Sequence, residues 1–230
     1  MLLIAQLSDP HIRLDDEASQ PALAAAVERV LALRPAPAAV LVTGDIANSG
    51  DPAEHERARE LLAPLSMPVY TAAGNHDLLG MRHQYAVQAG PMRIVVCDTS
   101  KMGRDEGSLD VEWLEGQLLA DLPTIVAMHH PPILMGLPWL DKIGLPAEER
   151  DALADLLRRS PQVLRVVTGH VHRASANTLG GCGVVTCAST NIAAELDFST
   201  PEMALANEPP SFLVHALLDS GELISHVQPV

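Results

Sequence analysis

The chain has 230 residues, and its 47% hydrophobic content is enough to fill a sizeable core. The formal net charge is −14 with only 15 Lys and Arg, so nucleic acid polymers and acidic membrane surfaces would be repelled. This balance excludes both as main partners. It does not exclude a small phosphate ester, because bound divalent cations would dominate the local field.

The first half of the chain alternates apolar runs with helical stripes. Apolar runs at 2–7, 39–42 and 69–72 predict buried strands. Apolar residues at helical spacing predict helices over 19–33 and 51–62. This rhythm predicts parallel βαβ units and therefore an α/β fold.

The second half mixes helices with more closely spaced strands. Its predicted elements are strands at 94–96, 125–128, 163–167 and 184–187, helices near 110–119 and 147–158, and strands at 212–218 and 223–227. The last two strands flank Ser220-Gly221 and predict an antiparallel hairpin. Three prolines and few periodic apolar positions predict a long surface loop at 195–210.

No Gly/Ser-rich or Pro-rich linker interrupts the chain, so we expect residues 1–230 to form one domain. The first apolar run begins at residue 2, which leaves no room for a removable signal peptide. No apolar stretch approaches the length that spans a bilayer. The three cysteines lack Cys-x-x-Cys spacing and predict buried, reduced thiols. We therefore expect a cytoplasmic protein.

Polar residues of the metal-ligand type follow the predicted strands. They are Asp9-Pro10-His11, Gly44-Asp45, Gly74-Asn75-His76-Asp77 and Gly169-His170-Val171-His172, with His129-His130 between the last two. Open α/β sheets place their ligand sites at strand ends, so these residues are expected to converge. Carboxylates, imidazoles and one amide oxygen, without a thiolate, favour Mn²⁺, Fe, Co or Zn²⁺. The set predicts a two-metal site for hydrolysis, with Asp45 as the natural bridging carboxylate.

Spacing suggests how the ligands would share an ion. Residues i and i+2 of a strand share a face, so Asp9 and His11 would reach one ion if the extended backbone continues past Leu7. The same argument applies to His170 and His172. Glycine precedes three of the motifs, as expected where a strand turns sharply beside an ion.

Several other side chains could have either a structural or a functional role. We interpret four histidines as structural or solvated: His55, His83, His215 and His226. His130 is an alternative to His129, although adjacent residues of an extended segment point in opposite directions. Tyr85 and Phe198 are the aromatic residues best placed to line a substrate pocket, and Arg13 would contact either a phosphate or a surface carboxylate.

With these motifs in this order, the chain resembles the calcineurin-like metallophosphoesterase superfamily, whose pattern is Asp-x-His, Gly-Asp, Gly-Asn-His-Asp/Glu, His and Gly-His-x-His. The resemblance covers residues 1 to about 173. It is closest to the branch of class III cyclic nucleotide phosphodiesterases and glycerophosphodiesterases, which also shows a tail similar to Ser189-Thr190 and Pro210-Ser211-Phe212. It implies a four-layer αββα sandwich, with two mixed β-sheets flanked by helices.

The resemblance also implies residue roles. One metal would be held by Asp9, His11, Asp45 and His172, and the other by Asp45, Asn75, His129 and His170. His76 would stay unligated, face the substrate and stabilise or protonate the leaving oxygen. Asn48 occupies a place where relatives often carry an aspartate that orients this histidine, and its side chain can still accept a hydrogen bond.

The implied activity is that of a binuclear metal-dependent phosphodiesterase, in which metal-bound hydroxide attacks a small phosphodiester. A 3′,5′-cyclic nucleotide such as cyclic AMP is the first candidate substrate, and a glycerophosphodiester or another small organic phosphodiester would suit the same site. A non-enzymatic alternative is an inactive interaction scaffold. The chain retains every type of metal ligand, which argues against this alternative. A protein phosphatase is disfavoured, because the basic residues that usually bind a phosphoprotein in that branch of the family are not evident in this sequence. Relatives often pair, so a homo-oligomer stays open.

Overall fold

The computed structural model describes residues 1–77, 83–118 and 121–230. Its elements in chain order are β1 (Leu2–Leu7), α1 (Ser19–Ala32), β2 (Ala39–Thr43), α2 (Pro52–Leu62), β3 (Val69–Ala72), β4 (Tyr85–Ala89), β5 (Met92–Val96), α3 (Val111–Gln117), β6 (Thr124–Ala127), α4 (Ala147–Arg158), β7 (Val163–Thr168), β8 (Ser175–Leu179), β9 (Cys182–Thr186), β10 (Ala193–Ala194), β11 (Leu205–Ala206), β12 (Ser211–Leu217) and β13 (Leu223–Pro229). Within the described ranges, no helix is long and apolar enough to cross a membrane.

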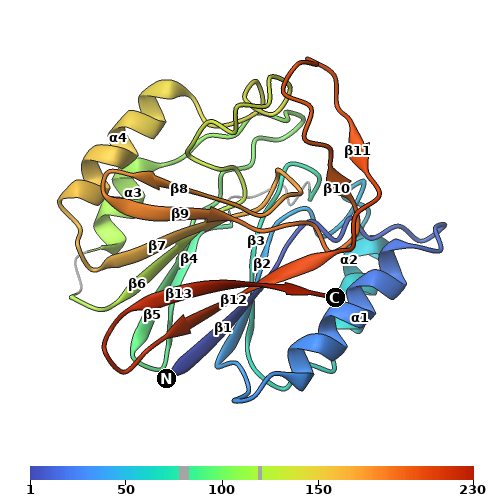
Figure 1. Ribbon diagram of the computed structural model, residues 1–230, viewed down its shortest axis with the longest axis horizontal. Coiled ribbons are helices and arrows are strands. Elements are labelled where there is room, and N and C mark those ends of the chain that lie inside the picture. The colour runs from blue at the N-terminus through green and yellow to red at the C-terminus, as the bar shows by residue number, and fades with distance from the viewer. Residues whose placement is uncertain (78–82, 119–120) are drawn as a thin grey trace.

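Two mixed sheets face each other, and helices cover their outer sides (Figure 1). The first sheet has the strand order β13-β12-β1-β2-β3, and the second has the order β4-β5-β6-β7-β9-β8. In the first sheet β1, β2 and β3 run parallel, whereas β12 and β13 add an antiparallel hairpin. The predicted αββα sandwich and the C-terminal hairpin are therefore confirmed.

Alternation along the central strands builds three apolar layers. Leu3 and Leu7 of β1 pack with α1 and α2, while Ile4 between them packs against the second sheet. In β6, Ile125 faces the first sheet and Val126 packs with α3 and α4. Strands buried on both faces in this way read as continuous apolar runs, which is why the sequence revealed them.

Two edge strands and one short hairpin escaped prediction. β8 is mostly exposed and β4 at the opposite edge is mostly half-buried, so neither has the continuous apolar run of a strand that is buried on both faces. The predicted loop at 195–210 is partly wrong, because Leu205–Ala206 pairs with Ala193–Ala194 as β11 and β10. The predicted helix near 110–119 is α3, and Leu119 lies outside the described residues.

Candidate metal centre

The seven predicted metal ligands all follow the carboxyl ends of parallel strands. Asp9 and His11 follow β1, Asp45 follows β2, Asn75 follows β3, His129 follows β6, and His170 and His172 follow β7. Because the two sheets face each other, these strand ends meet at one edge of the sandwich. The structure brings all seven side chains together.

The first donor set contains Asp9, His11, Asp45 and His172. All four are buried, and one ligand atom from each lies within 4.8 Å of the others. The Nε2 atoms of His11 and His172 are 3.0 Å apart. His11 Nε2 also lies 3.5 Å from Asp45 Oδ2, and His172 Nε2 lies 3.6 Å from Asp9 Oδ1.

The second donor set adjoins the first through Asp45. Asn75 Oδ1 lies 3.0 Å from His129 Nε2 and 3.1 Å from His170 Nδ1. His129 Nε2 is 3.3 Å from Asp45 Oδ2, the same oxygen that approaches His11 in the first set. His129 Nδ1 donates to the Thr43 carbonyl at 2.8 Å, which directs Nε2 toward the set.

Charge in this cluster favours a cation. Burial lowers the pKa of His129, but Asp45 and Asp9 outweigh burial and raise this pKa to about 9. Burial would raise the pKa of Asp45, yet His129 and His11 hold it well below its usual range. Burial lowers the pKa of His11 to about 3, so His11 presents a neutral imidazole. At a pKa of about 9 His129 carries a proton at neutral pH, so the buried carboxylates already attract a positive charge, and a divalent ion that replaces this proton would find carboxylate and imidazole donors that fit it.

The ligand turns are left-handed. The only non-glycine residues with positive φ in the described ranges have φ between 44° and 69°, and they are Asp9, His11, Asp45, His170 and His172. The condition that extended backbone continues past Leu7 is therefore not met, although Asp9 and His11 still lie in one donor set. Each such conformation costs on the order of 1–3 kcal/mol and persists only where the surroundings enforce it. The strain of this fold is concentrated in its candidate ligands.

Close packing around Asp9 explains one of the predicted glycines. The Asp9 carboxylate accepts the His170 N–H at 3.1 Å and the Ser8 hydroxyl, and its carbonyl accepts the Ser189 hydroxyl at 2.7 Å. A Cβ on Gly169 would lie 2.1 Å from Ser8 Oγ and 2.8 Å from Asp9 Oδ2. Only glycine fits there, as the turn argument predicted.

Asp77 is an organising residue whose role the sequence did not reveal. Its carboxylate accepts the N–H groups of Ile46 at 2.8 Å, Ala47 at 3.0 Å and Gly74 at 2.8 Å. It thereby ties the turn after β2 to the turn after β3. Its place at the end of the Gly-Asn-His-Asp motif was the available signal. Burial, with Asp45 nearby, raises the pKa of Asp77 to about 6.

His76 lies at the edge of both donor sets without joining them. Its Nδ1 donates to the main-chain carbonyl of Asn48 at 2.7 Å, and its N–H donates to Asp45 Oδ1 at 2.9 Å. The expectation that the Asn48 side chain orients His76 is therefore wrong, because the backbone does so. With Nδ1 committed to this bond, Nε2 is the nitrogen available to the cavity.

His130 lies among the ligands but both of its nitrogens are engaged. The Thr99 hydroxyl donates to His130 Nδ1 at 2.8 Å, and His130 Nε2 donates to the Asp105 carbonyl at 3.0 Å. Although its ligand atoms come within 4.8 Å of those of His129 and His170, it has no lone pair to offer.

The remaining histidines and Arg13 lie away from the donor sets. His55 Nε2 donates to the Asp77 carbonyl at 3.0 Å, and His83 Nε2 lies 3.4 Å from the Thr71 hydroxyl. His215 is buried in β12, whereas His226 is exposed on β13. The structural or solvated interpretation holds for all four. Arg13 forms its ion pair with exposed Asp15 at 3.4 Å.

A cavity of about 330 Å³ opens over the centre. Besides candidate ligands, His76 and Asn48, its lining consists of Asp105, Trp139, Ile143, Ile192 and Met203. The aromatic residue at the cavity is thus Trp139. The interpretation of Tyr85 and Phe198 as lining residues is wrong for this cavity: the Tyr85 hydroxyl donates to the Thr71 carbonyl at 2.9 Å, and 61% of Phe198 is exposed.

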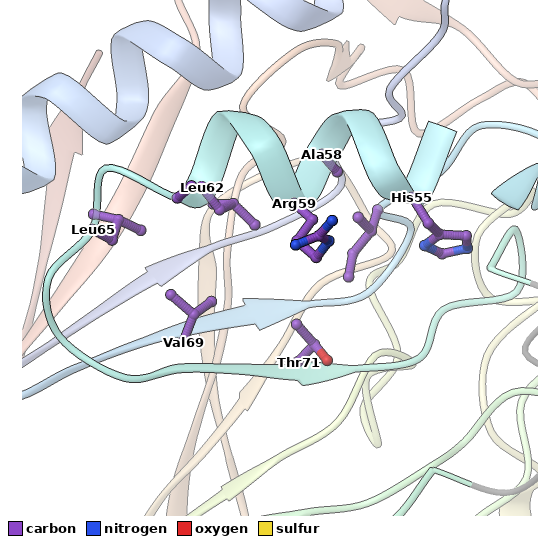
Figure 2. Close-up of a pocket in the computed structure, with 9 residues that line it drawn as sticks. His55, Ala58, Arg59, Leu62, Leu65, Val69 and Thr71 are labelled. Carbon is purple, nitrogen blue, oxygen red and sulfur yellow. The ribbon is translucent and has the colours of Figure 1, made fainter. Parts of the chain in front are cut away.

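A second cavity of about 520 Å³ lies between α2 and β3 (Figure 2). His55 and Arg59 reach into it from α2, above Val69 and Thr71 of β3. Its lining is mainly apolar and includes none of the predicted ligands, and Arg59 is already paired with Glu56. Greater volume therefore does not make it the candidate for catalysis.

The two-sheet sandwich and its two adjoining donor sets define an αββα protein with a candidate dinuclear metal centre. Residues 2–174 match the model of the calcineurin-like phosphoesterase family, and the chain belongs to that family. The resemblance that the motifs indicated is confirmed, and it supports two divalent metal ions.

Comparison with individual proteins agrees with this family assignment. The glycerophosphodiester phosphodiesterase GpdQ of Enterobacter lignolyticus is 31% identical, over 93% of this chain and 86% of its own length. The 3′,5′-cyclic adenosine monophosphate phosphodiesterase CpdA of Pseudomonas aeruginosa is 29% identical, over 100% of this chain and 90% of its own length. Among solved structures, a dimetal phosphatase from Danio rerio shares the fold with a TM-score of 0.73 at 16% identity, covering 99% of this chain and 96% of that one.

Proposed function

We propose that this protein is a phosphodiesterase that depends on two divalent metal ions and hydrolyses a small phosphodiester. The observation that carries the proposal is the sharing of Asp45 Oδ2 between two buried donor sets, beside an unligated histidine that faces the same cavity. One ion would be held by Asp9, His11, Asp45 and His172, and the other by Asp45, Asn75, His129 and His170.

The substrate proposal rests on the relatives. Two of them are named for the hydrolysis of cyclic AMP and of glycerophosphodiesters. A 3′,5′-cyclic nucleotide is the first candidate for this chain, and a glycerophosphodiester is the alternative. Oxygen and nitrogen donors without thiolate favour Mn, Fe, Co or Zn as the metals. We also propose that residues 1–230 work as one domain, because the ligands come from both sheets. The cytoplasmic location stays a prediction.

When bound, two divalent ions supply an acidified water near neutral pH and neutralise charge that develops on the phosphoryl oxygens. The chain's own residues position the reaction. Thr43 holds the tautomer of His129 through Nδ1, and the Asn48 carbonyl holds that of His76. In its protonated form, His76 Nε2 would donate a proton to the leaving oxygen. The bond from the His76 N–H to Asp45 Oδ1 keeps this acid at a fixed place beside the bridging carboxylate.

Metal analysis followed by kinetics tests the proposal. The protein reconstituted with Mn²⁺ is expected to bind two equivalents and to hydrolyse 3′,5′-cyclic AMP, with an aryl phosphodiester as internal control. A kcat/KM above about 10⁴ M⁻¹s⁻¹ on the cyclic nucleotide lies in the ordinary enzyme range. Activity on the control alone would move the search to glycerophosphodiesters. Less than one bound equivalent together with no turnover would favour the interaction scaffold instead.

A further inference from the structure

The space in front of the candidate centre is divided into two lobes. The larger lobe, of about 330 Å³, is the cavity described above, and the smaller one has about 160 Å³. They share the lining residues Asn48, Asn75, His76 and Asp105. The two ester arms of an acyclic phosphodiester leave one phosphorus in different directions, so a two-lobed space beside the metals and His76 offers one lobe to each arm.

The lobes differ in chemistry. Beyond the candidate ligands, His76 and Asn48, four apolar side chains and one carboxylate line the larger lobe, and in the described ranges neither Lys nor Arg lines it. The smaller lobe adds Ser49, Gly103 and Arg104 to the shared residues. The smaller lobe therefore suits a small polar arm. The larger lobe suits an apolar arm, because beyond the candidate ligands, His76 and Asn48, a polyol there would find only the Asp105 carboxylate and the indole N–H of Trp139 as hydrogen-bonding groups.

The four apolar side chains of the larger lobe, called the apolar wall below, belong to two segments of the fold. Trp139 and Ile143 lie between β6 and α4 and pack on a separate small cluster of Leu137, Leu140 and Val171. Val171 is 1% exposed and stands between the ligand residues 170 and 172. The wall is thus anchored to the same turn that carries two candidate ligands.

Hydrogen bonds hold the chain segment that leads into the apolar wall. The Asp141 carboxylate accepts the N–H of Met135 at 2.7 Å and the N–H of Gly136 at 3.1 Å, which closes the turn that precedes Trp139. Ile192 and Met203 complete the apolar lining from the segment around β10 and β11. Trp139 therefore presents a preorganised surface, which lowers the entropic cost of binding against it.

We propose that Trp139 is a specificity determinant that stacks on a flat aromatic group of the substrate, such as an aryl ester arm or the base of a 3′,5′-cyclic nucleotide, an inference that rests on the proposed phosphodiesterase function. An indole offers a large, rigid apolar surface on which an aromatic ring can stack. A volume of about 330 Å³ is at the small end of ligand pockets, so it holds one ring system rather than a long chain. The site selects diesters that carry an aromatic group over diesters with two polar arms.

Two diesters with a common glycerol arm test this selection. Glyceryl phenyl phosphate has one aromatic arm, whereas glycerophosphoethanolamine has two polar arms, and ³¹P NMR follows both. Trp139→Ala should lower kcat/KM on the phenyl diester roughly 10-fold, mainly through KM, because it removes a stacking surface. It should leave kcat/KM on the polar diester nearly unchanged. Each variant is compared with wild type on the same substrate, so the difference in leaving group cancels.

The chain offers a matched control in its other tryptophan, Trp113, which packs with α3 and α4 rather than at the cavity. Trp113→Phe should leave the ratio of the two kcat/KM values unchanged. In this background Trp139 is the sole tryptophan, so its fluorescence should be quenched by phenylphosphonate and not by methylphosphonate. Trp139→Phe should restore most of the phenyl preference, and Ile143→Thr gives a second variant if Trp139→Ala does not fold.

Equal losses on both diesters, or an unchanged preference in Trp139→Ala, would overturn the assignment. A wild-type protein inactive on both diesters and on 3′,5′-cyclic AMP would instead contradict the proposed function. The fluorescence titration still decides about the lobe in that case: selective quenching by phenylphosphonate supports an aromatic site, and equal or absent quenching refutes it.

Discussion

Replacing His215 with glutamine should reduce the loss of folding stability that this protein suffers in mild acid. His215 lies fully buried in β12, where its Nε2 donates to Gln6 Oε1 at 2.9 Å and its Nδ1 accepts from the Ser225 hydroxyl at 2.8 Å. Both bonds suit a neutral imidazole. Burial, with Arg165 adding a smaller repulsion, lowers the pKa of His215 to about 3 from an ordinary value of 6.5.

The sign follows from proton binding. As pH falls below 6.5 the unfolded chain protonates this histidine first, while the folded protein resists until about pH 3. The contribution of neutral His215 is therefore complete above pH 6.5 and is lost progressively down to pH 3. At 1.36 kcal/mol per pKa unit, the loss is about 2 kcal/mol at pH 5 and about 4 kcal/mol at pH 3.

Urea unfolding at pH 7.5 and pH 5 measures this loss. The difference in unfolding free energy between wild type and His215→Gln should shift by about 2 kcal/mol between the two pH values, in favour of the variant at pH 5. His226→Gln, at an exposed position on the neighbouring strand, is the matched control and should track wild type. Parallel pH profiles for wild type and His215→Gln would refute the argument.

Four further predictions concern the centre. Asp45→Ala should abolish activity and lower metal content at both positions, and full metal content by elemental analysis would contradict its shared role. His76→Ala should keep both metals while kcat falls by a factor on the order of 10² to 10⁴, since a general acid is lost, and metal loss would make it a ligand. Asn48→Ala should leave kcat close to wild type because the bond to His76 comes from the backbone, and a loss as large as that of His76→Ala would refute this. Gly169→Ala should release metal in an equilibrium dialysis assay, because its Cβ would lie 2.1 Å from Ser8 Oγ, and an unchanged metal affinity would show that the turn can relax.

The strands that carry the centre were predictable because their surroundings are uniform. Four of the five strands, β1, β2, β6 and β7, are buried almost throughout, so each appears in the sequence as a short apolar run followed at once by a polar motif, whereas β3 is an edge strand that is mostly half-buried. Edge strands β4 and β8 receive no such signal. Each pairs on one side only and is partly or mostly exposed, so their residues satisfy a neighbour rather than a core.

The identity of the candidate ligands could be inferred from the order and type of the motifs together with the family resemblance. The backbone conformation of these ligands could not be inferred in this way. The spacing of Asp9 and His11 suggested extended backbone, but the structure has left-handed turns with φ of 50° and 44°. Contacts with Ser8, with the His170 N–H and with the segment at Ser189 hold the Asp9 turn, and two of these partners are more than 150 residues away in sequence.

From the sequence alone, short local patterns of burial and ligand chemistry predicted the α/β class and the set of side chains offered to two metals, and the family resemblance that these motifs carry implied the αββα architecture. Only the tertiary structure decided which nitrogen of His76 faces the cavity, that His130 has no free lone pair, that Asp77 joins two turns and that Trp139 lines the substrate space. Each of these depends on a partner from a distant segment. No local pattern records such a partner, since it exists only once the two sheets have packed.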